Sequence, residues 1–201
     1  MFCSAFAVRV ASVLVSGLLL TGCAGTRSDE LPVSSFTARA VAAAEAARVV
    51  RVIDADTYIL LSGGSMFRLR LLGVDAPEQD QAFGRQAIDS VAKLLPPGRV
   101  VLVAKAGHDL YGRTLGAVLL PTATVAAVGR PVPLDSLMVV RGWAWASDPD
   151  RLVAGRAAQQ TAAQRAWRGL WKCGVSQAVP PKLWRSFNSE IKRRYRVGCT
   201  W

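Results

Sequence analysis

The chain has 201 residues, of which 51% are apolar; this excludes a chain that is disordered throughout and suits one domain with a sizeable core. Lysine and arginine outnumber aspartate and glutamate by 25 to 14, which gives a formal net charge of +11. Such a basic balance favours polyanionic partners, either nucleic acid or anionic lipid.

The first residues have the pattern of an export signal. Arg9 precedes an apolar run at residues 10–20, which is short for a membrane span but has the length of a signal-peptide core. The run ends in LTGC (residues 20–23), which resembles the lipobox of bacterial lipoproteins. The resemblance implies cleavage before Cys23, lipid on its sulfur and a membrane-attached lipoprotein of the cell envelope, on the periplasmic face or the cell surface. The alternative is an ordinary secretory signal that happens to be followed by a cysteine.

Composition divides the rest of the chain. After a signal peptide at residues 1–22, residues 23–46 are small and polar and predict a flexible spacer. Alanine-rich residues 37–47 predict a short helix at its end. The folded domain is expected at residues 47–172, followed by a basic extension at residues 173–201.

The domain opens with apolar stretches of strand character. These lie at residues 48–54, 57–62 and 67–75. Gly63 and Gly64 between the second and third stretches predict a tight hairpin.

Helix and strand signals then alternate. Apolar side chains recur at helical spacing in residues 82–95, before a PPG break. Strands are predicted at residues 99–105 and 114–121, with a loop at 107–113 between them. Residues 122–133 predict an irregular or inserted hairpin.

Two helices are expected near the end of the domain. One runs from residue 134 to Gly142, and a longer one occupies residues 148–171 with Asp148 or Asp150 as its N-cap. Five short strands with about three helices predict an α+β, mainly β fold, for which a five-stranded OB-fold barrel is the leading candidate.

Acidic residues interrupt the apolar strands at two places. Asp54 and Asp56 follow the first strand, and Asp75 and Glu78 follow the third. Buried charges are costly unless they pair or bind an ion, so these carboxylates are expected to meet at one rim of the barrel. Oxygen ligands suit Ca²⁺ or Mg²⁺. A zinc cluster is not expected, because His108 is the single histidine, and catalysis by this loop residue is not expected either.

Two arginines add the chemistry of phosphate. The forked guanidinium groups of Arg70 and Arg113 match phosphate oxygens and can offset charge that develops during phosphoryl transfer. A metal would polarise the phosphate, and a free carboxylate would take a proton from water.

Three segments together resemble the signature blocks of the staphylococcal nuclease (thermonuclease) family. They are VIDADT (residues 52–57), RLLGVDAPE (70–78) and DLYGR (109–113), in the family's order and spacing. The similarity covers residues 48–171. It implies a calcium-dependent endonuclease that cleaves DNA and RNA with little sequence preference and leaves 3′-phosphates.

The resemblance also implies a role for each matching residue. The calcium ligands would be two carboxylates and one backbone carbonyl, from Asp56, Asp75 and Ala76. The catalytic residues would be the general base and two phosphate-binding arginines, namely Glu78, Arg70 and Arg113.

Further positions would support the site or depart from the family. Asp54 matches an outer acid and Thr57 a supporting hydroxyl. Tyr111 either stacks on sugar or base or simply packs. Ala55 replaces a glycine, which costs about 1 kcal/mol if the residue needs positive φ. Leu110 replaces a lysine that can hold a terminal phosphate.

The cysteines support export. Cys3 leaves with the signal and Cys23 would carry lipid, so Cys173 and Cys199 are expected to form one disulfide in an oxidising compartment. The basic, tyrosine-containing run at residues 192–199 suits contact with single-stranded nucleic acid. A solvated helix end held by the disulfide explains it equally well.

The expected substrates are DNA and RNA, the expected membrane contact is the lipid on Cys23, and no protein partner is inferred. One alternative is an OB-fold lipoprotein that binds nucleic acid without cutting it. Another is a structural envelope lipoprotein that inherited the fold. The full set of acids and arginines favours the nuclease.

Overall fold

A computed structural model of the chain describes residues 43–124, 127–147 and 153–196. These residues all belong to one of the two units into which the chain divides, Pro32–Trp201. The expected signal peptide, Cys23 and Cys199 lie outside the described residues. Within the part of the chain that is described, no helix has the length and apolar character needed to cross a membrane.

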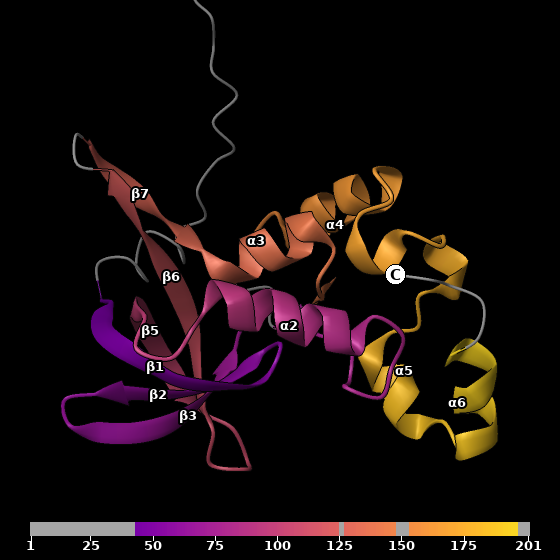
Figure 1. The fold of residues 1–201 in the computed structure, drawn as a ribbon, viewed down its shortest axis with the longest axis horizontal. Helices are drawn as coiled ribbons and strands as arrows, with labels where there is room; N and C mark the ends of the chain where they lie inside the picture. The colour runs from indigo at the N-terminus through magenta and orange to yellow at the C-terminus, as the bar shows by residue number, and fades with distance from the viewer. Residues whose placement is uncertain (1–42, 125–126, 148–152, 197–201) are drawn as a thin grey trace, which may run out of the picture. The chain divides into compact units, whose positions relative to one another are not determined.

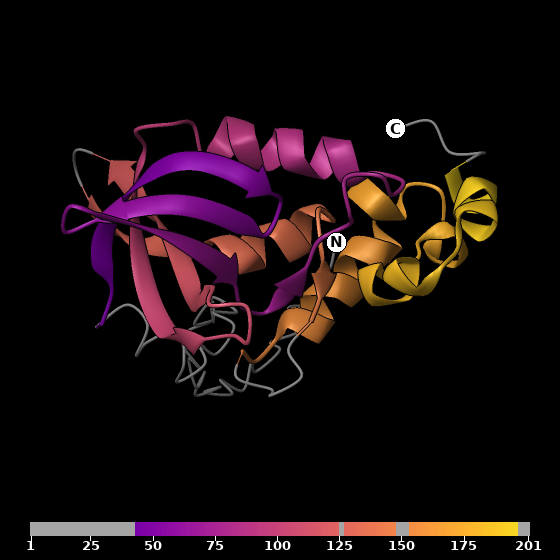
Figure 2. The same ribbon diagram turned by 90° about the horizontal axis from the view of Figure 1, so that it is seen from below.

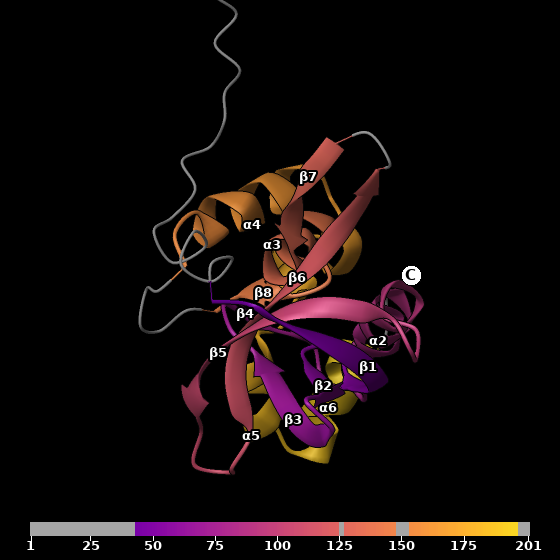
Figure 3. The same ribbon diagram turned by 90° about the vertical axis from the view of Figure 1, so that its left-hand side faces the viewer.

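The main sheet closes on itself as a barrel (Figures 1 and 3). Its strands are β1 (Glu45–Asp54), β2 (Thr57–Ser62), β3 (Ser65–Leu71), β5 (Val100–His108) and β6 (Thr114–Thr124). The order is β3-β2-β1-β5-β6, and the neighbours in this order pair in antiparallel fashion. A short parallel pairing of β3 with β6, from Leu69↔Thr114 to Leu71↔Gly116, closes the ring. The predicted five-stranded barrel is confirmed.

Both predicted hairpins are present. Gly63 and Gly64 form the two-residue turn between Ser62 and Ser65, with φ values of 57° and 80° that glycine adopts without steric cost. The irregular segment is a long hairpin of β6 and β7 (Ala127–Pro133), which extends the sheet beyond the barrel.

Apolar side chains from the strands and two helices fill the barrel. Fully buried residues include Tyr58, Leu60, Leu69, Val101 and Val103. Helix α2 (Gly84–Leu94) contributes Ala87 and Val91 of the predicted apolar stripe. Helix α3 (Leu134–Arg141) adds Leu134, Met138 and Val139. This packing fixes the rim of the barrel on which the charged residues lie.

The structure differs from the sequence prediction at residues 45–47 and at both ends of the longer predicted helix. Residues 45–47, expected in a helix, begin β1, because they pair with residues 101–103 of β5. Helix α4 (Arg156–Arg165) starts after Gly155, whose φ is 84°, so it is not capped by Asp148 or Asp150, which lie outside the described residues. It also ends before residue 171, because Trp167 adopts a positive φ of 53°, and Gly169–Trp171 form a separate 3-10 helix. Helix α3 ends as predicted at Gly142, a left-handed C-cap.

The described residues contain five α-helices, two more than the sequence predicted. The additional ones are α5 (Pro181–Ser186) and α6 (Ser189–Arg196), which lie in the basic extension. In Figures 1 and 2 the strands lie to the left and these yellow helices to the right, beyond the end of α2. Trp184 of α5 is fully buried, so the extension packs onto the domain.

Candidate active site

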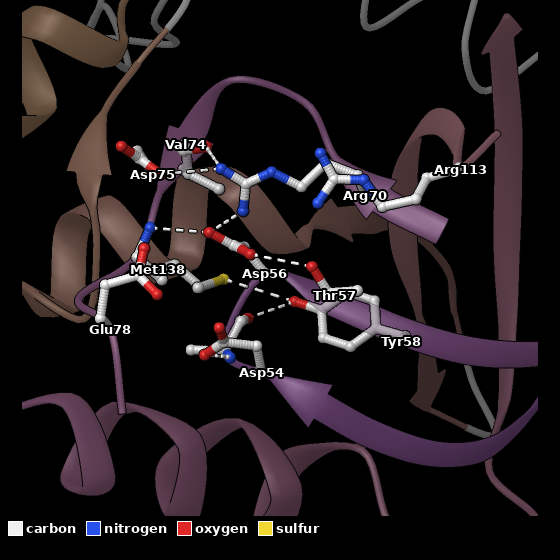
Figure 4. A network of polar contacts seen from close by, with 12 residues as sticks. Asp54, Asp56, Thr57, Tyr58, Arg70, Val74, Asp75, Glu78, Arg113 and Met138 are labelled. Atoms are coloured by element: carbon white, nitrogen blue, oxygen red, sulfur yellow. Dashed lines mark hydrogen bonds and ion pairs between the residues drawn. The ribbon is translucent and has the colours of Figure 1, made fainter. Parts of the chain in front are cut away.

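The barrel strands bring the charged residues of separate sequence blocks together. Thr57 at the start of β2 pairs with Arg70 in β3, so Asp56 lies next to the arginine. Asp75 ends the short strand β4 (Val74–Asp75), which pairs with β8 (Trp145–Ala146). Figure 4 shows the Arg70 guanidinium between the Asp56 and Asp75 carboxylates.

Arg70 is the centre of this cluster. Its Nη2 donates to Asp75 Oδ1 at 2.8 Å, and its Nη1 forms an ion pair with Asp56 Oδ2. Only 18% of the side chain is exposed. Burial lowers the pKa of Arg70 from its usual value, although the charge of Asp75 opposes the shift. An arginine stays protonated even so, and the site therefore keeps a fixed cation at its centre.

Asp56 is held by the backbone as well as by Arg70. The Ala76 N–H donates to Asp56 Oδ2 at 2.8 Å, and the Thr57 hydroxyl donates to Oδ1 at 3.1 Å. These bonds fix the orientation of a carboxylate whose side chain is 6% exposed. The Ala76 N–H bond also holds the backbone of Ala76 beside Asp56, whereas the expected role of the Ala76 carbonyl as a calcium ligand stays a prediction.

Glu78 has a partner that the sequence blocks did not indicate. Arg185, in α5, donates from Nη1 to Glu78 Oε1 at 2.6 Å and from Nη2 to Asp75 Oδ2 at 3.4 Å. Burial acts against the charge of Arg185, but the bonds to Glu78 and Asp75 raise its pKa above the usual value. The basic composition of the extension was the one available signal, and it did not single out this residue.

Arg113 is positioned by the loop between β5 and β6. Asp109 accepts the backbone N–H groups of Tyr111 and Arg113 at 2.9 and 3.0 Å, and the Arg113 Nε at 2.6 Å. Burial would raise the pKa of Asp109, but these bonds lower it overall. Figure 4 shows the Arg113 side chain next to that of Arg70. The loop thus supplies a second guanidinium to the same rim.

The tip of this loop faces solvent. Leu110 is fully exposed and Tyr111 is 84% exposed, so Tyr111 does not pack in the core. The Arg113 guanidinium lies 5.5 Å from the centre of the Tyr111 ring. His108, at the end of β5, is exposed as well.

Asp54 and Ala55 form the turn that leads to Asp56. Asp54 Oδ1 accepts the Ala55 N–H at 2.8 Å, and the buried Tyr58 hydroxyl donates to the Ala55 carbonyl at 2.6 Å. Burial raises the pKa of Asp54, although the Ala55 N–H opposes the shift. Among the described non-glycine residues, positive φ occurs at Phe83 and Trp167, so Ala55 is not strained. The expected cost of alanine at this position is therefore absent.

The donors at this rim fit a hard divalent cation. Asp56 and Asp75 offer carboxylate oxygens on both sides of a bound cationic group, the Arg70 guanidinium. Ca²⁺ prefers this kind of oxygen ligand. In the described ranges no group of three or more His, Cys, Asp and Glu side chains is arranged to hold a metal ion.

A closed barrel with arginines and carboxylates at one rim defines a hydrolase site for phosphate esters. The profile of the family described as "Staphylococcal nuclease homologue" matches residues 68–173. The chain belongs to this family.

Two relatives match about two thirds of the chain, and a third matches a shorter part. It is 35% identical to an "Uncharacterized endonuclease" of Escherichia coli O157:H7 over 138 residues, which cover 69% of this chain and 83% of the relative. It is 38% identical to "Protein ParB" of Escherichia coli over 144 residues, covering 68% and 77%. A "Thermonuclease" of Staphylococcus hyicus is 40% identical over 80 residues, covering 36% and 47%.

Proposed function

We propose that this protein is a calcium-dependent endonuclease that hydrolyses the backbones of DNA and RNA and leaves 3′-phosphates. The family and the relatives named as endonucleases support nuclease activity. The observation that carries the proposal is the Arg70 bridge between Asp56 and Asp75, with Glu78 hydrogen-bonded to the same cluster through Arg185.

Each residue has a defined part in the proposed reaction. Glu78 accepts a proton from water, whose oxygen attacks phosphorus as the bond to the 5′-oxygen breaks, and the departing 5′-oxygen takes up a proton from solvent. Arg70 and Arg113 bind the phosphate oxygens and stabilise the added negative charge. Asp56, Asp75 and the Ala76 carbonyl would hold Ca²⁺, which would polarise the phosphate.

Little sequence preference is expected. The two arginines address phosphate, and phosphate contacts carry no direct information about the bases. The net charge of +11 adds a general attraction for polyanions that weakens with salt.

The proposal places this activity at the cell envelope. The LTGC motif at residues 20–23 supports lipid attachment through Cys23, on the periplasmic face or the cell surface. Replacing Cys23 with serine should leave unprocessed precursor without fatty-acid label. Equal labelling of both proteins would reject the anchor.

A chelator experiment tests the nuclease. Full-length protein purified in detergent is incubated with labelled DNA or RNA, in Ca²⁺ or in excess EGTA. We expect cleavage in Ca²⁺, loss of cleavage in EGTA and recovery when Ca²⁺ is restored, with 3′-phosphate ends. DNA that is bound but not cut under every condition would instead support the binding-only alternative.

A further inference from the structure

The described part of the basic C-terminal extension, residues 173–196, docks on the loop that carries Glu78 (residues 75–83). The buried Trp184 indole donates from Nε1 to Asp80 Oδ1 at 2.8 Å, and Lys192 Nζ lies 3.3 Å from Asp80 Oδ2. Gln81 in the same loop donates through Nε2 to the Val179 carbonyl. The extension is therefore attached to this loop at several points, and its position relative to Glu78 is fixed.

Arg185 follows the Trp184 anchor and reaches two acidic residues of the site. Its two terminal nitrogens lie 2.6 Å from Glu78 Oε1 and 3.4 Å from Asp75 Oδ2. One arginine of the extension thus holds together the proposed base and a proposed calcium ligand. The family match ends at residue 173, so Arg185 lies outside the segment that defines the family.

We propose that Arg185 is a positioning residue that holds the Glu78 carboxylate ready to accept a proton from water. This inference rests on the proposed nuclease function. The C-terminal extension then forms part of the active site.

The need for such a partner follows from the exposure of Glu78. Its side chain is 31% exposed, and an unheld glutamate samples several rotamers. A general base must lie within hydrogen-bonding reach of the proton that it takes. Arg185 binds Oε1, and within the described residues Oε2 makes no hydrogen bond, so it is available to water. The guanidinium stays protonated and does not compete for the proton.

Arg185→Gln tests this role, with Lys182→Gln as the matched control. Both variants remove one positive charge from the exposed side of α5. Measured on full-length protein at saturating Ca²⁺, Arg185→Gln should lower kcat by roughly 10- to 100-fold, because misplaced catalytic groups lose rate on this scale. KM should change by less than about threefold, and Lys182→Gln should stay within about twofold of wild type in kcat. Equal losses in the two variants would mean that only general charge matters and would overturn the proposal.

A second pair of variants separates positioning from direct phosphate contact. In a Glu78→Gln background the positioned base is absent, so adding Arg185→Gln should lower the residual kcat by less than about twofold. A full additional loss would show that Arg185 acts on substrate independently of Glu78. A rise in kcat for Arg185→Gln alone would show that the contact between Arg185 and Glu78 is inhibitory. Either result overturns the positioning role.

An inactive wild type would reject the nuclease function and this role together, whereas an active wild type with an unchanged Arg185→Gln rejects this role alone.

Discussion

Thr57 and Arg70 lie opposite each other in the β2–β3 ladder. Asp56 is one residue before Thr57, so this pairing sets the Arg70 guanidinium against the Asp56 carboxylate. The register is fixed by the two-residue Gly63–Gly64 turn, and a slip of one residue would turn Arg70 to the other face of the strand. The chemistry of the rim therefore depends on a hairpin turn at the other end of the two strands.

The guanidinium forks of Arg70 and Arg113 should matter more than their charge. Arg70→Lys and Arg113→Lys keep a cation but lose two-pronged binding. We expect kcat to fall by about 100-fold or more in each, the scale on which loss of one stabilising donor acts. KM should change little, as steady-state kinetics on a DNA substrate would show. An effect confined to KM would mean that the arginines bind only the ground state.

Glu78→Gln should separate catalysis from binding. The amide keeps the shape of the side chain but accepts no proton, and a positioned base contributes about 10²- to 10⁴-fold to the rate. We expect a kcat loss in that range, with DNA affinity by fluorescence anisotropy within about threefold of wild type. Arg85→Gln, which removes an exposed charge from α2, serves as the control. A Glu78→Gln enzyme that cuts within twofold of wild type would show that Glu78 is not the base.

Asp54 should make stability fall as pH rises. Burial raises its pKa in the folded protein, so the folded state favours the protonated form. The resulting stability is present below the usual pKa of 3.8 and is lost as pH rises through the higher folded value. Asp54→Asn keeps the acceptor for the Ala55 N–H but does not titrate. Its free energy of unfolding, measured by urea without Ca²⁺, should therefore increase relative to wild type as pH rises from about 3.8 through the higher folded pKa of Asp54, and level off above it. A difference that stays constant over this range would contradict the expectation.

Much of this site was predictable because its residues lie in strands with strong local signals. The Gly63–Gly64 turn and the spacing from Arg70 to Asp75 are fixed within a short segment, so the barrel and the rim followed from sequence. The start of α4 could not be predicted from the sequence in the same way. Asp148 and Asp150 are good capping residues, but they lie outside the described residues and α4 follows Gly155, a glycine with positive φ and no side chain to form a cap.

Arg185 was missed for a different reason. Its contact with Glu78 spans 107 residues and depends on where Trp184 docks. The extension contains many basic residues, and composition cannot tell which of them faces the site. A contact of this range becomes visible only when the packing of α5 is known.

Cys173 should be linked by a disulfide to Cys199, near the end of the chain. Cys173 is disulfide-bonded, and its pairing with Cys199 remains a prediction because Cys199 lies outside the described residues. Intact mass should rise by about two hydrogens on reduction, and a non-reduced tryptic digest should contain both cysteines in one linked pair. A double serine variant should retain the barrel and become more sensitive to trypsin after Arg193 and Arg194. Free thiols at both positions in exported protein would contradict the pairing.

The last prediction concerns the buried pair of Asp135 and Arg156, which joins α3 to α4 behind the active-site strand β4. Arg156 Nε lies 2.6 Å from Asp135 Oδ2, and the two side chains are 8% and 5% exposed. Asp135 also packs against Gly73, where a Cβ atom would lie 2.9 Å from Oδ2 and φ is 81°. Asp135→Asn would leave the Arg156 charge buried without a counterion.

Removing one partner of a buried ion pair costs about 3–5 kcal/mol, so Asp135→Asn should lower the free energy of unfolding by that amount in urea titrations. Glu190→Gln is the control, because it breaks the exposed Glu190–Arg194 pair, whose side chains are 65% and 73% exposed. An exposed pair of this spacing contributes about 0.5 kcal/mol at most. Equal losses in the two variants would show that the Asp135–Arg156 pair does not stabilise the junction of α3, α4 and β4. Arg156→Met with Asp135→Leu should recover much of the stability, because an apolar pair leaves no buried charge unpaired.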